Sequence, residues 1–374
     1  MWTGDLVHER KLAGIRRFAD MRGWSVFTIG EKKSRPDRLP GALNRIRPVG
    51  CIVESSSGHR DLPPRLFGSV PTVYLDCPEG LYGDRVSRSM HDDEATVRRA
   101  FSELCSTCPS AYGVIGHGEA YFWSRKRVRI FRDLVGRSGL PCRVFPSMRR
   151  RDPAERAKRL AAWVKKLPCK CALFAVNDIV AREVVQACRA VGRSVPEDMT
   201  LVGVDNCAEI CETSVPKISS VQIDFERAGY RAALLVDRLR THRGPYCETF
   251  GPLMTVRRES TRGFGRCGPQ MLAAIDLIRR EACNGLRASD VVKLFKGSRR
   301  LVDMRFRETF GHSILDEIQN VRFEKVLFLL RQTRMPPWAI AAQCGFGSEV
   351  TLREQFRRRM GQSMRTWRQA NSED

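Results

Sequence analysis

Arginine side chains recur in two matching segments near the carboxyl end of the chain. The segment that begins at Ser298 and the one that begins at Ser348 share Ser, apolar and Arg positions at an offset of 50 residues. A guanidinium group can donate paired hydrogen bonds to the edge of a guanine and can also hold a phosphate. The repeat therefore predicts two DNA-contacting surfaces. Their candidate residues are Ser298, Arg299, Arg300, Asp303 and Arg305 in the first copy, and Ser348, Glu349, Val350, Arg353 and Arg357 in the second.

The elements around these arginines have the pattern of a helix-turn-helix. In the first copy, Ser289 is the expected N-cap of a short helix, and Gly297 supplies the turn because glycine tolerates a positive φ. Val302, Phe306 and Phe310 follow at helical spacing and predict a buried stripe on the second helix. The arginines of this helix then lie on its solvent side, where they can enter a major groove.

The second copy repeats this arrangement. Pro337 suits a first helical turn, Gly345 turns the chain, and Leu352 and Phe356 anchor the last long helix. A connecting helix over 313–330 could hold the two reading helices in successive major grooves, about 34 Å apart. The alternative is a helical bundle with a solvated basic face. The duplicated turn glycines favour DNA binding over that alternative.

This part of the chain resembles the AraC family of transcription regulators. The resemblance covers residues 270–374 and implies two helix-turn-helix units bridged by one helix, bound to double-stranded DNA. Leu352 and Met364 depart from the family pattern at packing positions, while Met304 and Glu354 depart at positions that often read bases. The residues that carry the resemblance are Ile340, Cys344, Gly345, Phe346, Phe356, Arg357, Gly361, Ser363 and Trp367.

The preceding part of the chain alternates strand-like and helix-like segments. Such alternation predicts βαβ units with parallel sheets, in which ligands bind beyond the carboxyl ends of the strands. The expected strands are 49–53, 72–75, 111–115, 172–176, 200–204 and 220–223. The expected helices are 6–22, 92–104, 124–135, 153–167, 178–191 and 225–239.

Polar side chains gather where several of these strands end. Asn177 and Asp178 follow one strand, Asp205 follows the next, and His117 and Trp123 follow a third. Carboxylates and amides can bind sugar hydroxyls, and an aromatic ring can cover the apolar face of a sugar. The alternative is that Asn177 and Asp205 only cap the helices that follow. Spacing alone leaves both interpretations open.

These segments resemble the sugar-responsive domain of LacI-type regulators. The resemblance rests on the segments 173–178, 195–198, 202–206 and 219–222. It implies a two-lobed, periplasmic-binding-protein-like fold with an effector in the cleft, and with crossings between the lobes near residues 91, 224 and 250. It also implies hydroxyl-binding roles for Arg127, Asn177 and Asp205; Trp123 is a candidate stacking residue and Asp178 a further candidate contact.

Composition bounds the remaining possibilities. The net charge of +23 suggests a polyanionic partner, and no apolar run approaches the length of a membrane span. No signal peptide pattern precedes the first helix, so a cytoplasmic location without membrane contact is expected. The 14 cysteines and 6 histidines show no zinc-finger spacing, so neither a metal nor a cofactor is expected, and disulfides are not expected either.

A LacI-like sensor followed by an AraC-like reader resembles the xylose operon regulator group of AraC-type activators. We expect a sensor over 1–262, a linker over 263–269 and a DNA-binding domain over 270–374. The resemblance implies an activator, not an enzyme, in which a xylose-like monosaccharide controls the geometry of a homodimer that can contact RNA polymerase. The first strand of the family's sensor is not found. The alternatives are a sugar-binding or carbohydrate-processing protein with an accessory helical domain, and a DNA binder with a non-functional sensor.

Overall fold

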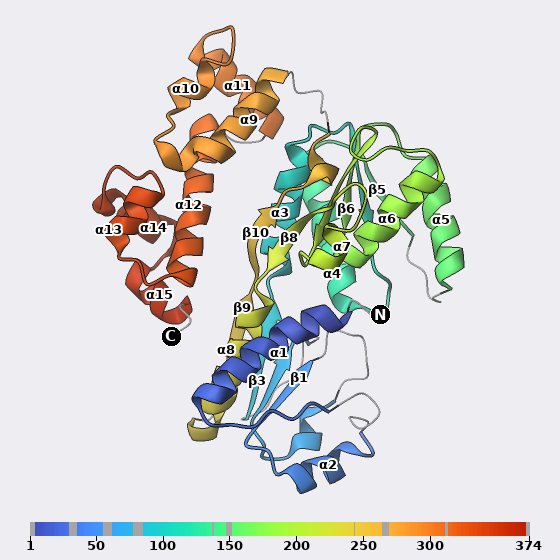
Figure 1. Cartoon of the computed structure of the whole chain (residues 1–374), viewed down its shortest axis with the longest axis vertical. Helices are drawn as coiled ribbons and strands as arrows, with labels where there is room; N and C mark the ends of the chain where they lie inside the picture. Colours follow the sequence, from blue (N-terminus) through green and yellow to red (C-terminus); the bar gives the residue numbers. More distant parts are fainter. Residues whose placement is uncertain are drawn as a thin grey trace. The chain divides into compact units, whose positions relative to one another are not determined.

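In a computed structural model, the chain folds into two compact units (Figure 1). One unit comprises residues 1–103 and 110–263, and the other comprises 104–109 and 264–374. The structure describes residues 4–29, 36–54, 62–77, 85–136, 138–146, 152–242, 244–263, 269–310 and 313–371. Most of the expected linker, residues 264–268, therefore lies outside the described residues.

The larger unit contains a four-stranded parallel sheet, which forms the amino-terminal lobe. Its strand order is β1, β2, β3, β9, with β1 at one edge. The long helices α1 and α8 pack closely against each other, and α8 also contacts the sheet. The bounds are β1 Cys51–Glu54, β2 Thr72–Leu75, β3 Val86–His91, β9 Cys247–Phe250, α1 Gly4–Met21, α2 Leu39–Ile46, η1 Pro64–Phe67 and α8 Phe225–Thr241.

A six-stranded sheet forms the second lobe of this unit. Its order is β10, β8, β7, β6, β4, β5, and only the β10–β8 pair is antiparallel. Buried aromatic rings such as Phe131 and Phe174 stack at 4.8 Å in its core. The bounds are β4 Ala111–Ile115, β5 Cys142–Val144, β6 Cys171–Ala175, β7 Met199–Val204, β8 Ser219–Ile223, β10 Pro252–Val256, α3 Asp93–Cys105, α4 Phe122–Gly136, α5 Pro153–Lys165, α6 Asp178–Ala190, α7 Ala208–Cys211 and η2 Glu259–Thr261.

The chain crosses between the two sheets three times. It leaves the first sheet after β3, returns to it between β8 and β9, and leaves it again between β9 and β10. These crossings lie near His91, Asp224 and Gly251, as predicted. The two-lobed α/β fold with parallel sheets is therefore confirmed. Parallel strands place their carboxyl ends at one edge of each sheet, which is where the site described below lies.

The predicted elements are correct in type, but four strands were not predicted. Each predicted strand and helix is present to within about three residues, which is the usual uncertainty at element ends. The missed strands are β3, β5, β9 and β10, because β3 mixes polar and apolar residues and the other three are short and partly exposed. Among the described residues α1 is the first element, and β1 pairs only with β2.

The second unit consists of helices around two apolar cores. The long helix α12 (Ile314–Gln332) supplies Ile314 and Ile318 to one core, and Phe323 and Val326 to the other. It therefore bridges the two copies of the repeat, as predicted. The remaining helices are α9 Pro269–Glu281, η3 Ala282–Asn284, α10 Ala288–Val292, α11 Arg299–Phe310, α13 Pro337–Gln343, α14 Glu349–Met360 and α15 Met364–Asn371.

The caps of these helices match the sequence patterns with one exception. Ser313 and Asp316 form the predicted capping box of α12, and the Ser348 hydroxyl accepts a hydrogen bond from the N–H of Thr351 at the start of α14. The prediction that Ser289 is an N-cap is wrong. Helix α10 begins two residues earlier than predicted, with Arg287 as its N-cap, and the Asp290 carboxylate accepts a hydrogen bond from the Arg287 N–H.

One cysteine also departs from expectation. Cys108, in the segment that follows α3, is disulfide-bonded. The expectation of a chain without disulfides, which rested on the missing signal peptide pattern alone, is therefore wrong at this residue. The other cysteines of the described part of the chain are not disulfide-bonded.

Candidate functional site

A buried lysine joins the strand ends of the amino-terminal lobe. Lys11, on α1, donates to Oε2 of Glu54 at 2.9 Å and to Oδ2 of Asp76 at 3.0 Å. Glu54 ends β1 and Asp76 directly follows β2. Burial disfavours the charged form of Lys11, but the two carboxylates outweigh it and raise the pKa of the ammonium above its usual value. Lys11 therefore stays charged and holds both carboxyl groups at this edge of the sheet.

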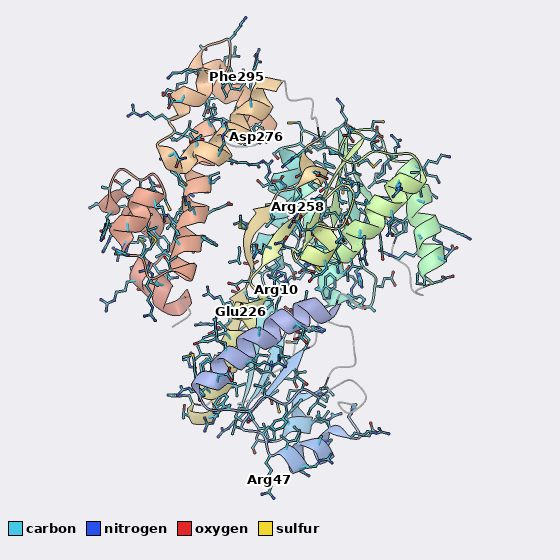
Figure 2. The ribbon with its side chains drawn as sticks, in the orientation of Figure 1. Arg10, Arg47, Glu226, Arg258, Asp276 and Phe295 are labelled. Atoms are coloured by element: carbon cyan, nitrogen blue, oxygen red, sulfur yellow. The ribbon has the colours of Figure 1, made fainter. Side chains whose placement is uncertain are left out.

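Two glycines bring α1 close enough to place this lysine. A Cβ on Gly14 would lie 1.8 Å from the carbonyl oxygen of Glu226, and one on Gly229 would lie 1.8 Å from that of Lys11. The backbones of α1 and α8 thus touch where a larger residue would separate them. This contact points Arg10 and Lys11 toward the strand ends; Figure 2 labels Arg10 on α1 and Glu226 on α8.

Arg127, on α4, lies at the centre of the contacts between the lobes. Its Nε donates to Oδ1 of Asp93 at 2.9 Å, and its two terminal nitrogens donate to the carbonyl oxygen of Val176 at 2.7 Å and to Nδ1 of His91 at 2.7 Å. Lys126 also pairs with Asp93, at 3.2 Å. The guanidinium is thus buried and fixed by groups that follow strands of both sheets.

The protonation of His91 follows from this network. Burial and the neighbouring Arg127 charge lower the pKa of His91 well below its usual value, so the ring is neutral. Because arginine can only donate, Nδ1 of His91 accepts from Arg127, and Nε2 carries the proton toward Oγ1 of Thr96 at 2.9 Å. Burial would raise the pKa of Asp93, but the Arg127 guanidinium brings it below its usual value.

Asp205 presents a carboxylate that no described residue pairs with. It follows β7, and among the described residues none donates a hydrogen bond to its side chain. Burial raises the pKa of Asp205 to about 7, although the charges of Arg127, Lys11 and Arg10 oppose this shift. Its backbone is held in the positive-φ region at 104°. A carboxylate of this kind is available to accept hydrogen bonds from a ligand.

The neighbouring predicted residues Asn177 and Asp178 are engaged differently. Oδ1 of Asn177 accepts from the N–H of Val180 and caps α6, while its Nδ2 has no acceptor within the described ranges. Asp178 accepts from Oγ of Ser220 at 2.6 Å and from the N–H of Cys207 at 2.8 Å. Both oxygens of Asp178 thus hold the carboxyl-terminal lobe together, so a direct ligand contact by Asp178 stays a prediction.

Trp123 belongs to an aromatic group beside Arg127. The Arg127 guanidinium lies 5.0 Å from the centre of the Trp123 ring, and the ring of His117 stacks on Trp123 at 5.8 Å. Tyr121 completes the group at 5.6 Å from Trp123. These half-buried rings follow β4, at the same edge of the sheet as Asn177 and Asp205.

The structure thus brings Trp123, Arg127, Asn177 and Asp205 to the strand ends, and Arg127 reaches the other lobe through His91. Sequence reasoning missed the groups of the amino-terminal lobe. A usable signal existed for Asp76, which follows its strand as Asp205 does. No comparable signal marked Lys11, because its helix approaches the strand ends only through tertiary packing. The missed residues are Lys11, Glu54, Asp76, His91 and Asp93.

The candidate DNA interface lies on α11 and α14. Their apolar stripes are buried, with Val302 and Phe306 in one core and Leu352 and Phe356 in the other. The predicted DNA-contacting residues mostly lie on the opposite side. Those that are exposed are Ser298, Arg299, Arg300, Arg305, Ser348, Val350, Arg353 and Arg357.

Five charged side chains of these helices make contacts within the protein. Asp303 accepts from the N–H of Ile314 at 3.1 Å, so it helps to fix the start of α12, and it also pairs with Arg307. Glu349 pairs with Arg353 at 2.5 Å. Arg359 is also exposed, but its guanidinium contacts Asn320 and lies over the ring of Phe323.

Two protein families match parts of the chain. Residues 110–261 match a periplasmic binding protein-like domain, and residues 292–370 match a helix-turn-helix domain. The chain carries a periplasmic binding protein-like sensor domain and an AraC-type helix-turn-helix domain. This transcription regulator therefore combines the two modules predicted from its motifs.

Two curated relatives are similar to most of the chain. The regulator is 27% identical over 288 residues to the xylose operon regulatory protein of Escherichia coli K12, covering 75% of this chain and 74% of the relative. It is 28% identical over 263 residues to the protein of that name from Haemophilus influenzae, covering 69% and 68% of the two chains.

Solved structures show the same fold. The structure of the xylose-binding transcription activator xylR matches 98% of this regulator and 96% of that chain, at 23% identity and a TM-score of 0.55. The complex of the transcriptional regulator CelR with cellobiose matches 68% and 79%, at 25% identity and a TM-score of 0.57. Within the described part of the regulator, no helix has the length and apolar character that a membrane crossing requires.

Proposed function

We propose that this regulator binds a neutral monosaccharide, a pentose such as xylose, between the two lobes of its sensor. The observation that carries the proposal is the Asp205 carboxylate, which has no donor among the described residues and lies among groups from both lobes. The relatives named as xylose operon regulators support the choice of sugar. In this proposal the sensor spans residues 1–262 and the DNA-binding domain spans residues 270–374.

The charges around this site favour a neutral ligand. Lys11 is paired with Glu54 and Asp76, and Arg127 with Asp93. The guanidinium of Arg10 is bound to two backbone carbonyl oxygens. No cation among these is left to pair with a phosphate or a carboxylate of a ligand, whereas hydroxyl groups can both donate and accept here. A polyol therefore fits this site better than an anionic sugar.

Each of the candidate residues has a role in this proposal. The Asp205 carboxylate accepts hydrogen bonds from sugar hydroxyls, and the remaining N–H groups of Arg127 and of the Asn177 amide donate to them. The Trp123 ring covers an apolar face of the sugar. In the amino-terminal lobe, Asp76 contributes an acceptor whose position Lys11 fixes. Contacts from both lobes make the ligand favour one relative position of the lobes.

We further propose that the regulator is an activator that works as a homodimer. In this proposal, sugar binding selects a dimer geometry that presents the reading helices to repeated half-sites and allows contact with RNA polymerase. The similar solved structure of xylR is that of a transcription activator, which supports activation rather than repression of transcription. The ten predicted residues from Ser298 to Arg357 form the DNA interface, with Asp303 positioning α12 rather than reading bases.

The affinity for xylose is expected to rise by about tenfold between pH 6 and pH 8. The Asp205 carboxyl accepts from hydroxyl donors more strongly when it is ionised, and its pKa of about 7 makes it mostly protonated at pH 6 and mostly ionised at pH 8. Isothermal titration calorimetry of the full chain at both pH values measures this. Under the same conditions Asp205→Asn serves as control and should show no such rise. A flat wild-type profile, or the absence of binding at any pH, would contradict the proposed function.

Arg299→Ala and Arg353→Ala are each expected to weaken operator binding. Removing one base-reading arginine costs about 1–3 kcal/mol, which corresponds to roughly 5- to 150-fold in affinity. A gel-shift titration at fixed salt, with a DNA fragment selected by the wild-type protein from a random library, measures the loss. Arg280→Ala, on the exposed part of α9, is the matched control because it removes the same charge elsewhere in the unit. Equal losses for all three variants would argue for a general charge effect.

A further inference from the structure

The turn that follows β7 has an unusual backbone. Asp205 and Asn206 are consecutive non-glycine residues with positive φ, at 104° and 50°. Such conformations cost free energy and persist only where surrounding contacts enforce them. Here the N–H of Asp205 donates to the carbonyl of Val221 at 2.9 Å, and the N–H of Asn206 donates to Oγ of Ser220 at 3.0 Å. The turn is thus anchored on β8.

One further contact ties this turn to the amino-terminal lobe. The guanidinium of Arg10, on α1, donates to the carbonyl oxygen of Asp205 at 3.0 Å and to that of Ile223 at 3.3 Å. The residue proposed to bind the sugar is therefore held from the other lobe through its backbone. A change in the relative position of the lobes acts on the turn through this side chain.

Another contact ties the turn to the segment that leaves the sensor. Arg258 lies between β10 and η2, and Figure 2 labels it. It is buried, at 9% exposure, and its Nη2 donates to Oδ1 of Asn206 at 2.8 Å. Its other donors reach Glu212 at 2.5 Å and the carbonyl of Ile218 at 2.9 Å. Five residues further on, this unit ends at Gly263, and the chain continues to the DNA-binding domain.

We infer that the Asn206–Arg258 hydrogen bond couples the sugar site to the DNA-binding domain. Asp205 and Asn206 are adjacent, so a ligand that stabilises one geometry of Asp205 also selects the position of the Asn206 amide. Because Arg258 is hydrogen-bonded to that amide, a movement of the amide moves the Arg258 side chain and shifts the segment 258–263. Arg258 and Asn206 are therefore positioning residues for the response, and neither contacts the sugar. This inference rests on the proposed function, since it requires an effector at Asp205.

The experiment compares two separate quantities in the full-length protein. Calorimetry measures the affinity for xylose without DNA, and a gel shift with the selected DNA fragment measures the factor by which xylose changes operator affinity. Coupling factors of this kind are typically about 5- to 150-fold. The variants are Arg258→Gln, Asn206→Gly and the double variant. Glycine at 206 keeps the positive φ and removes only the amide, so it guards against loss of the fold.

Both single variants are expected to bring the coupling factor to within about twofold of one, while xylose affinity stays within about threefold of wild type. The double variant should lose no more than either single variant, because the two side chains act through one bond. Arg193→Gln is the matched control: this arginine also bonds a buried carbonyl of the same lobe, that of Leu167 at 3.0 Å, but it does not contact the turn. It should keep the wild-type coupling factor.

Other results would overturn the inference. If both variants bind xylose and retain the wild-type coupling factor, the Asn206–Arg258 bond does not transmit the signal, and the proposed function still stands. Additive losses in the double variant would show that the two residues act separately. If the wild-type protein itself shows no xylose response, the proposed function and this inference fail together.

Discussion

Asp205→Asn is expected to lower the affinity for xylose by roughly two to four orders of magnitude. The carboxylate is proposed to accept charge-assisted hydrogen bonds from two hydroxyl groups, each worth about 1.5–3 kcal/mol. Asparagine keeps the shape of the side chain and tolerates the positive φ of 104° at this position. The loss therefore reports the charge and the acceptor geometry rather than the backbone. Calorimetry at pH 8, where the wild-type carboxylate is ionised, measures it.

Basal DNA binding should not change in this variant, because Asp205 belongs to the sensor and α11 and α14 belong to the other unit. Asp198→Asn is the matched control. Asp198 precedes β7 whereas Asp205 follows it, so the same substitution is made at the opposite end of one strand. Unchanged xylose affinity in Asp205→Asn would remove this residue from the proposed site.

Phe356→Ala is expected to destabilise the second helix-turn-helix by about 3–5 kcal/mol, and operator binding should be lost with it. The Phe356 ring is fully buried. Its centre lies 5.5 Å from the centre of the Phe323 ring and 5.8 Å from that of the Trp367 ring. Removing it leaves a cavity between α12, α14 and α15. Because this core is small, its neighbours have few other contacts with which to compensate.

Hydrogen exchange of the α14 amides in the full-length protein measures this loss locally, which avoids assuming two-state unfolding of a chain with two units. Phe328→Ala is the control, since Phe328 on the same α12 bridge is 41% exposed and should cost little. Similar protection of α14 in wild type and Phe356→Ala would mean that α14 does not depend on this core.

The helix-turn-helix units could be predicted closely because their signals are local. Gly345 shows why: its φ is +73°, and a Cβ there would lie 2.8 Å from the carbonyl oxygen of Cys283. Both the turn and the close approach require glycine, so the residue is visible in the sequence. Ser289 shows the limit of this reasoning. Arg287 became the N-cap because the Asp290 carboxylate bonds its N–H, a choice that serine preference alone does not reveal.

The sensor site was predictable on one lobe only. Asp205, Asn177 and Arg127 follow recognisable strands or fit a known motif, and the structure brings them to one sheet edge. Lys11 and Glu54 carried no such signal. They meet because two glycines, Gly14 and Gly229, allow α1 and α8 to touch. Both glycines are far from Glu54 in the sequence. The position of Arg258 beside Asn206 likewise depends on β10 pairing with β8.

The sequence alone determined the two modules, the repeat of the reading helices and one set of polar strand ends, because each depends on residues within a few positions of one another. Only the tertiary structure decided which of the described carboxylates are paired and that Asp205 remains available. That outcome depends on buried contacts between residues far apart in the chain, such as Arg10 with Asp205 and Arg127 with His91. Burial and pairing set the charge of each group, and neither can be read from a residue's neighbours in sequence.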